Sequence, residues 1–167
     1  MSGNKKRPYV LWDTSVFLAW FNKEADKDLV RLTAVVDEVD AMKVIVCVSA
    51  ISQAEILDTA KSFNAKALFS AFCKRSNVQQ LLPDERIIGL ASEIRQDALD
   101  GHQADKSRPK LKTPDAIIAA SAIIYQVPRM FSYDPDLLNL SGSPVLRSLI
   151  AEKPTTMTRS YSPPLFN

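Results

Sequence analysis

The feature that most constrains this chain is a short apolar run that ends in one acidic residue and passes directly into a helical pattern. The run is Tyr9 to Trp12, Asp13 follows it, and apolar residues at helical spacing begin at Val16. In an α/β protein, a buried parallel strand delivers such a residue to the edge of the sheet where ligands bind. Asp13 is therefore expected to lie at a ligand-binding edge.

Apolar runs and amphipathic stretches alternate through most of the chain and predict an α/β fold. The second apolar run, within residues 43–48, is continuous rather than alternating, as expected for a strand in a sheet that helices cover on both faces. The order of the elements implies a mostly parallel sheet with crossover connections. The expected strands are 9–12, 43–48, 77–82 and 129–132, with a fifth, edge strand within 145–151.

The chain has the size and composition of one domain with short tails. Its 167 residues, 46% of them apolar, are enough to bury a substantial core. We expect a flexible N-terminus over 1–8, a folded domain over 9–151 and an extended tail over 152–167. The longest apolar run, 116–125, is too short to span a membrane, and no apolar segment of signal-peptide length is seen at the N-terminus. The expected location is cytoplasmic.

Three further acidic residues lie at the edge of an apolar element, as Asp13 does. They are Glu55, Asp115 and Asp134. Four carboxylates gathered at one sheet edge would repel one another unless protons or cations neutralise them. Mg²⁺ and Mn²⁺ take oxygen ligands, and two such ions about 4 Å apart can activate water for phosphodiester hydrolysis. For Asp115 alone, a place in the first turn of a helix has a purely structural explanation, because it complements the helix dipole.

The charge balance agrees with a polyphosphate substrate without requiring one. The formal net charge of +2 is too small to indicate nucleic acid or membrane by itself. When the four acids are set aside, 21 basic side chains face the remaining 15 of 19 acidic ones, which leaves about +6 on the rest of the surface. An ordinary mixed surface explains these numbers equally well. The single histidine, His102, lies in a polar stretch, which argues against histidine-based acid–base chemistry.

Four blocks of the sequence resemble, in their order and spacing, the acidic motifs of the PIN-domain ribonucleases. The blocks are WDTSVFLAW, VSAISQAEIL, TPDAIIAASAI and FSYDPDL. The likeness covers roughly residues 9 to 150 and is greatest to the VapC-type toxins of toxin–antitoxin pairs. Any single block is weak evidence, whereas the ordered set of four is specific. The resemblance implies a PIN-like, three-layer α/β/α fold with a central, mostly parallel sheet of four to five strands.

The resemblance also implies a site, a cofactor and partners. The catalytic, metal-binding acids would be Asp13, Glu55, Asp115 and Asp134, supported by the hydroxyls of Ser15 and Ser132. The last block, SYDPD, leaves Asp134 and Asp136 open as the fourth ligand, and Asp134 is preferred because it follows the strand more closely. The implied cofactor is Mg²⁺ or Mn²⁺. The implied activity is endonucleolytic cleavage of RNA by a homodimer that an antitoxin protein restrains.

A basic stretch lies a few residues ahead of Asp115. Its charges are Lys106, Arg108, Lys110 and Lys112. They could contact the RNA backbone and supply affinity without sequence choice, while a solvated loop is the structural alternative. If they contact RNA, removal of the four charges weakens RNA binding and flattens its salt dependence.

Other functions remain open on the sequence alone. The same fold could be an RNA-processing or DNA-acting nuclease without an antitoxin, or a catalytically silent binding module. A phosphoryl-accepting signalling domain is least favoured. It needs an acidic pair after the first strand and an acceptor aspartate after the third, whereas this chain has the single Asp13 and Leu82-Pro83.

Overall fold

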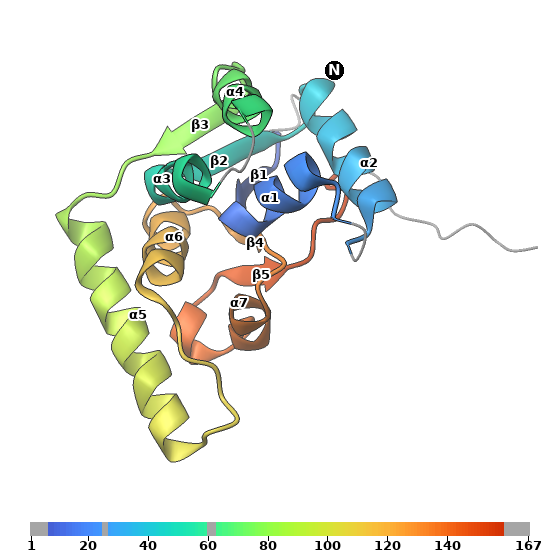
Figure 1. Cartoon of the computed structure of the whole chain (residues 1–167). Coiled ribbons are helices and arrows are strands. Elements are labelled where there is room, and N and C mark those ends of the chain that lie inside the picture. Colours follow the sequence, from blue (N-terminus) through green and yellow to red (C-terminus); the bar gives the residue numbers. More distant parts are fainter. Residues whose placement is uncertain (1–6, 25–26, 60–62, 159–167) are drawn as a thin grey trace, which may run out of the picture.

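Five parallel strands form one sheet in the part of the chain that the computed structural model describes, residues 7–24, 27–59 and 63–158 (Figure 1). The strands are β1 (Tyr9–Trp12), β2 (Ile45–Ser49), β3 (Val78–Leu81), β4 (Arg129–Phe131) and β5 (Ile150–Glu152). They lie in the order β3-β2-β1-β4-β5, and every neighbouring pair is parallel. The predicted α/β class and the parallel sheet are confirmed. Strand order reverses at β1, the position where open α/β sheets bind ligands.

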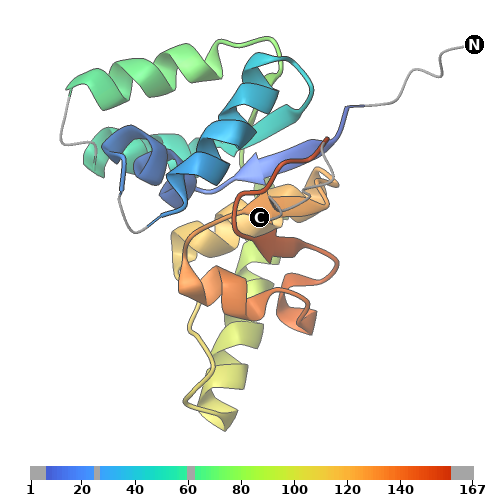
Figure 2. The same cartoon turned by 90° about the vertical axis from the view of Figure 1, so that its right-hand side faces the viewer.

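The helices cover both faces of this sheet. They are α1 (Thr14–Asn22), α2 (Leu29–Asp40), α3 (Ala50–Thr59), α4 (Phe63–Cys73), α5 (Glu85–Ala104), α6 (Thr113–Ile124) and α7 (Pro135–Leu140). Figure 2 shows α1, α2 and α4 on one side of the sheet and α5, α6 and α7 on the other. The three-layer arrangement is therefore as predicted. Among the described helices, none is long and apolar enough to cross a bilayer.

Strand β1 is buried from both sides because its successive side chains point to opposite faces. Val10 and Trp12 pack into the apolar cluster beneath α1, α2 and α4, while Leu11 joins the cluster beneath α5 and α6. The first cluster is rich in aromatic rings. Phe17 of α1 lies at its centre, with ring centroids 5.3 Å from Trp12 and 5.1 Å from Phe69. This packing fixes the junction of β1 and α1, where Asp13 lies.

The last strand lies at the end of its predicted window and one residue beyond it. The window predicted from the sequence is 145–151, whereas β5 covers 150–152. A 3-10 helix at Pro144–Leu146 occupies the earlier part, since proline suits the first turn of a helix and lacks the N–H that a sheet requires. The predicted edge strand is therefore present, but it is shorter than the predicted window.

A buried carboxylate holds the segment that follows β5. Glu38 of α2 is 4% exposed. It accepts hydrogen bonds from the backbone N–H groups of Met157 at 2.6 Å and Thr158 at 3.0 Å, and from the Thr158 hydroxyl. Residues 153–158 form no helix or strand and run from the sheet toward α2 (Figure 2). The rest of the expected tail, 159–167, and residues 1–6 of the expected flexible N-terminus lie outside the described residues.

Replacement of Glu38 by alanine is expected to detach this segment. Two backbone N–H groups would lose a charged acceptor, which costs about 1–3 kcal/mol of unfolding free energy. Urea unfolding would show the loss, and amide hydrogen exchange would speed up selectively at Met157 and Thr158. The matched control is Asp37→Ala, because Asp37 is the exposed neighbour of Glu38 on the same helix. Equal destabilisation by both variants would contradict this account.

Candidate functional site

Asp13 stands at the junction of the central strand and the first helix. It has extended backbone angles, φ −72° and ψ 159°, and caps the N-terminus of α1 by accepting a hydrogen bond from the Ser15 N–H. Its side chain is 3% exposed. Burial raises the pKa of Asp13, and hydrogen bonds from Ser15 and Ser132 oppose that effect. A carboxylate placed in this way is fixed by β1 and costly to keep ionised without compensation.

Two serine hydroxyls tie Asp13 to the loop after β4. Ser15 Oγ donates to Asp13 Oδ2 at 2.6 Å and accepts from the Tyr133 N–H at 2.9 Å. Ser132 Oγ donates to the same oxygen at 2.9 Å and accepts from the Asp134 N–H at 2.9 Å. Each hydroxyl has one proton, and both protons are directed to Asp13. Asp13 and the loop that carries Asp134 are thus positioned together.

Asp134 begins the last α-helix, as Asp13 begins the first. It caps α7, and its Oδ1 accepts from the Asp136 N–H at 2.7 Å. Asp134 is among the main charges that raise the pKa of Asp115. Asp136 lies in the first turn of α7 and contributes its backbone N–H to the cap. This placement favours Asp134 over Asp136 as the fourth acid.

Asp115 is a buried acid near the start of α6. It lies in the first turn of α6 and is 9% exposed. Its Oδ2 is buried and has no hydrogen-bond partner among the described residues. Burial raises the pKa of Asp115 to about 7, and the charges of Asp13, Asp134 and Glu55 add to the effect, while Lys112 opposes it. The helix dipole alone therefore does not explain why an acid occupies this buried position.

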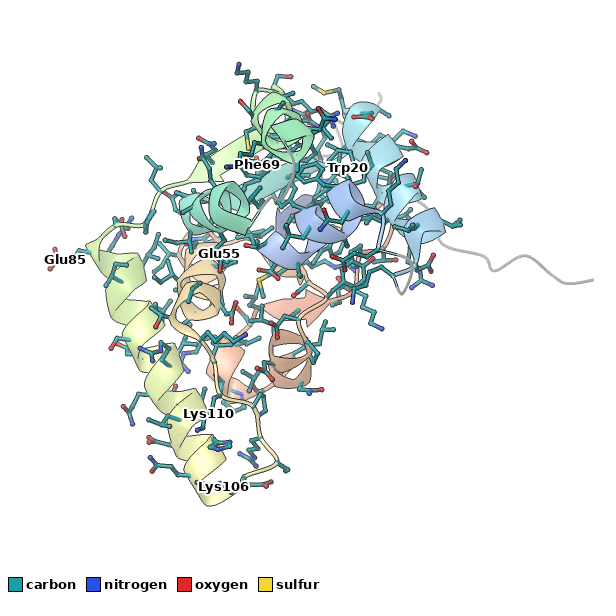
Figure 3. All side chains as sticks on the ribbon, in the orientation of Figure 1. Trp20, Glu55, Phe69, Glu85, Lys106 and Lys110 are labelled. Atoms are coloured by element: carbon teal, nitrogen blue, oxygen red, sulfur yellow. The ribbon has the colours of Figure 1, made fainter. Side chains whose placement is uncertain are left out.

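Glu55 completes the group from α3. Figure 3 shows it projecting from α3 toward α6. Thr14 Oγ1 donates to Glu55 Oε2 at 2.6 Å, and this fixes the carboxylate. Burial raises the pKa of Glu55 and Asp13 contributes to the rise, whereas the Thr14 hydrogen bond and Lys112 lower it. The site predicted from the sequence did not include Thr14. The signal for a further role is its position directly after Asp13.

The four acids are neighbours, but they do not form a closed cage. Among the described residues, no group of three or more His, Cys, Asp or Glu side chains is close enough to hold one metal ion. Mutual charge effects nevertheless link Asp115 with the three other acids. The unpartnered Oδ2 of Asp115 and a donor set made only of carboxylate oxygens fit a hard divalent cation.

The basic stretch ahead of Asp115 is divided by the fold. Lys112 precedes α6 and acts on both Glu55 and Asp115. Arg108 lies beside Gly101 near the end of α5 and pairs with Asp105. Lys106 and Lys110 lie far from Glu55, toward the far end of α5 (Figure 3). Of the four bases, the structure brings only Lys112 to the acids.

A parallel α/β sheet with carboxylates at the carboxyl ends of its central strands defines a class of protein suited to divalent cations and phosphate esters. The family model of the PIN domain matches residues 10–142, so this chain belongs to the PIN domain family. A search of the curated proteins found no significant match.

Solved structures share the fold at low sequence identity. A toxin–antitoxin complex from Klebsiella pneumoniae matches with TM-score 0.59 and 18% identity over 89% of this chain and 99% of that one. VapBC2 from Rickettsia felis, bound to a fragment of promoter DNA, matches with TM-score 0.61 and 15% identity over 87% of this chain and 98% of that one. FitAcB from Neisseria gonorrhoeae matches with TM-score 0.54 and 19% identity over 87% of this chain and 97% of that one. At these identities, the likeness shows a common fold.

Proposed function

We propose that this chain is a divalent-metal-dependent endoribonuclease that hydrolyses RNA phosphodiester bonds and acts as the toxin of a type II toxin–antitoxin pair. The observation that carries the proposal is the buried, unpartnered oxygen of Asp115 among three other acids. Membership of the PIN domain family supports nuclease chemistry. The toxin–antitoxin complexes among the structural neighbours support an antitoxin partner. An assembly of two copies belongs to the same proposal.

In this proposal each acid has a role set by its place in the fold. Asp13, Asp115 and Asp134 hold Mg²⁺ or Mn²⁺, and Glu55 either binds the metal or orients the attacking water. When bound, the metal supplies an activated water and charge stabilisation for the phosphoryl group. Thr14 positions Glu55, and the hydroxyls of Ser15 and Ser132 position Asp13 and favour its ionised form. Lys112 balances part of the negative charge while the site is without a cation.

The test is cleavage of a mixed RNA pool by the purified protein with Mn²⁺, with Mg²⁺ and with EDTA, beside an Asp13→Asn variant. Metal-dependent cutting that the variant lacks supports the nuclease. Cutting in EDTA, or equal cutting by the variant, contradicts it. Toxicity on expression that the adjacent gene relieves separates a restrained toxin from an RNA-processing or DNA-acting enzyme. Calorimetry without a Mn²⁺ binding signal would favour a silent binding module.

Ser132 is expected to act as a positioning residue. Ser132→Ala removes one hydrogen bond to Asp13 and the acceptor of the Asp134 N–H. Loss of a residue that orients metal ligands typically costs about 10–100-fold in affinity or activity. The Ser132 hydrogen bond lowers the pKa of Asp13. Its removal should therefore raise that pKa and move the acid limb of the rate profile to higher pH. Cleavage rates against pH and Mn²⁺ concentration would show both effects.

The matched control for that variant is Ser121→Ala. Ser121 is equally buried, but its hydroxyl donates to the Ile117 carbonyl within α6. Its loss should leave rate and pH profile unchanged. A Ser132→Ala enzyme with a lower rate but an unshifted acid limb would argue for a general packing defect instead.

A further inference from the structure

A cleft of about 460 Å³ lies beside the loop that carries Asp134. Tyr133 and Pro135, the two neighbours of Asp134 in the chain, line it. The backbone N–H of Tyr133 donates a hydrogen bond to Ser15 Oγ within the acid site, and the same residue lines the cleft. The cleft and the acid site thus share one wall. A ligand that passes over this loop would reach both.

Three cationic side chains line the cleft. They are Lys27, Arg31 and Lys153, and Asp28 is the one carboxylate among the described residues that line it. The charge of Glu24 also acts on Tyr133. Lys27 Nζ lies 5.3 Å from the centroid of the Tyr133 ring, so a cation covers one face of that ring. Arg31 Nε is 3.3 Å from Asp28 Oδ2 in an exposed pair, and such pairs are weak. Three cationic side chains that line one cleft can donate charge-assisted hydrogen bonds to an anion.

Chain topology explains why these cations gather near the acids. Helix α2 leads to the amino end of β2, so its own N-terminus, with Lys27 and Arg31, lies toward the carboxyl edge of the sheet. Lys153 directly follows β5, whose carboxyl end lies at the same edge because all strands are parallel. Two separate segments, the start of α2 and the residue after β5, therefore bring three cations to the edge where Asp13 and Asp134 lie.

We propose that this cleft, which we call the basic cleft and define by Lys27, Arg31, Tyr133 and Lys153, binds backbone phosphates of the RNA strand next to the bond that is cut. This inference rests on the proposed ribonuclease function. It implies that the RNA strand runs from the acids over the loop that carries Asp134 and into the basic cleft. Because Lys27 covers the Tyr133 ring, the cleft recognises phosphate rather than a stacked base. Cations that contact phosphates supply affinity and salt dependence without sequence preference.

The chain offers a charge-matched control surface. Arg7, Lys43 and Lys74 are exposed and precede β1, β2 and β3 in turn. Since the strands are parallel, these three residues lie at the amino edge of the sheet, opposite the acids. Replacement of one arginine and two lysines by glutamine on either surface changes the net charge equally. Only the location of the lost charge differs.

The experiment measures binding of a labelled, mixed-sequence single-stranded RNA by fluorescence anisotropy over a series of KCl concentrations. Asp13→Asn is present throughout, with Mg²⁺, so that the RNA stays intact. The cleft variant is K27Q/R31Q/K153Q, and the control is R7Q/K43Q/K74Q. We expect the cleft variant to weaken binding about tenfold or more at low salt and to reduce the slope of log K against log salt by about 2. The control should change neither quantity appreciably.

Equal losses from both variants would reduce the effect to general charge and overturn the proposal. So would wild-type affinity in the cleft variant, or a cleft variant that loses antitoxin binding while RNA affinity stays unchanged. Lys153→Gln alone, an exposed single change, keeps the test valid if the triple variant unfolds, with an expected slope change of about 0.7. Failure here is distinct from failure of the ribonuclease proposal, because metal-dependent cleavage by the wild-type protein is scored separately.

Discussion

Asp13→Asn is expected to lower metal-dependent RNA cleavage about a thousandfold or more. Asparagine keeps the shape of the side chain and an oxygen that can accept from Ser15 and Ser132, so the fold should persist. It removes the charge through which the residue would hold a cation. Loss of several kcal/mol of transition-state stabilisation corresponds to a rate factor of this size. Initial rates on a labelled RNA with saturating Mn²⁺ would measure it.

The control for this prediction is Asp37→Asn, which neutralises an exposed acid on α2. It should retain the wild-type rate, and circular dichroism should show all variants folded. The same assay distinguishes the two acids of the SYDPD block. Asp134→Asn should resemble Asp13→Asn, whereas Asp136→Asn should have a much smaller effect. A fully active Asp13→Asn protein, free of trace nuclease, would end the metal-nuclease proposal.

Asp115→Asn is expected to stabilise the metal-free protein while it abolishes cleavage. In the folded state the pKa of Asp115 is raised to about 7, from an ordinary 3.8. As pH rises from about 4 to 7, the unfolded chain releases this proton and the folded protein does not, so stability falls over that window. Above it, folding carries the full cost of a buried charge. Asparagine avoids the charge but leaves an amide to satisfy, so a gain of about 1–2 kcal/mol at pH 8 is expected.

Thermal unfolding in EDTA at several pH values would test this prediction. Wild type should lose stability from pH 4 to 7 relative to Asp115→Asn, and the two curves should run parallel above that range. Mn²⁺ should raise the melting temperature of wild type and have little effect on the variant, because a ligand stabilises only the state that binds it. If Asp115→Asn is the less stable protein in EDTA at pH 8, the site does not carry the electrostatic cost inferred for it.

Much of the fold follows from the sequence because apolar runs and helical spacing are local signals. They predicted β1, β2, β3 and β4 to within one or two residues of their observed bounds. The edge strand β5 was less certain because it is short and its neighbours contain proline. Its final place depends on pairing with β4 and on the contacts of the segment that follows.

The four acids and the supporting hydroxyls of Ser15 and Ser132 could be proposed from the sequence because they lie in four ordered motifs, whereas contacts between distant segments could not. The Thr14–Glu55 hydrogen bond depends on how α3 packs against α1, and no spacing rule reports such a contact. The anchoring role of Glu38 joins residues far apart in the chain. The basic cleft combines Lys27 and Arg31 from the start of α2 with Lys153 from beyond β5, so no single stretch of sequence carries all three cations.

The central position of β1 has a consequence for synthesis on the ribosome. One neighbour of β1 is made early, but the other, β4, follows more than a hundred residues later, and Ser132 and Asp134 come with it. Domains tend to fold as units while the chain emerges. A nascent chain that has not yet exposed β4 has Asp13 without Ser132 and without Asp134. If the protein is the toxin we propose, each ribosome completes it before any RNA is at risk.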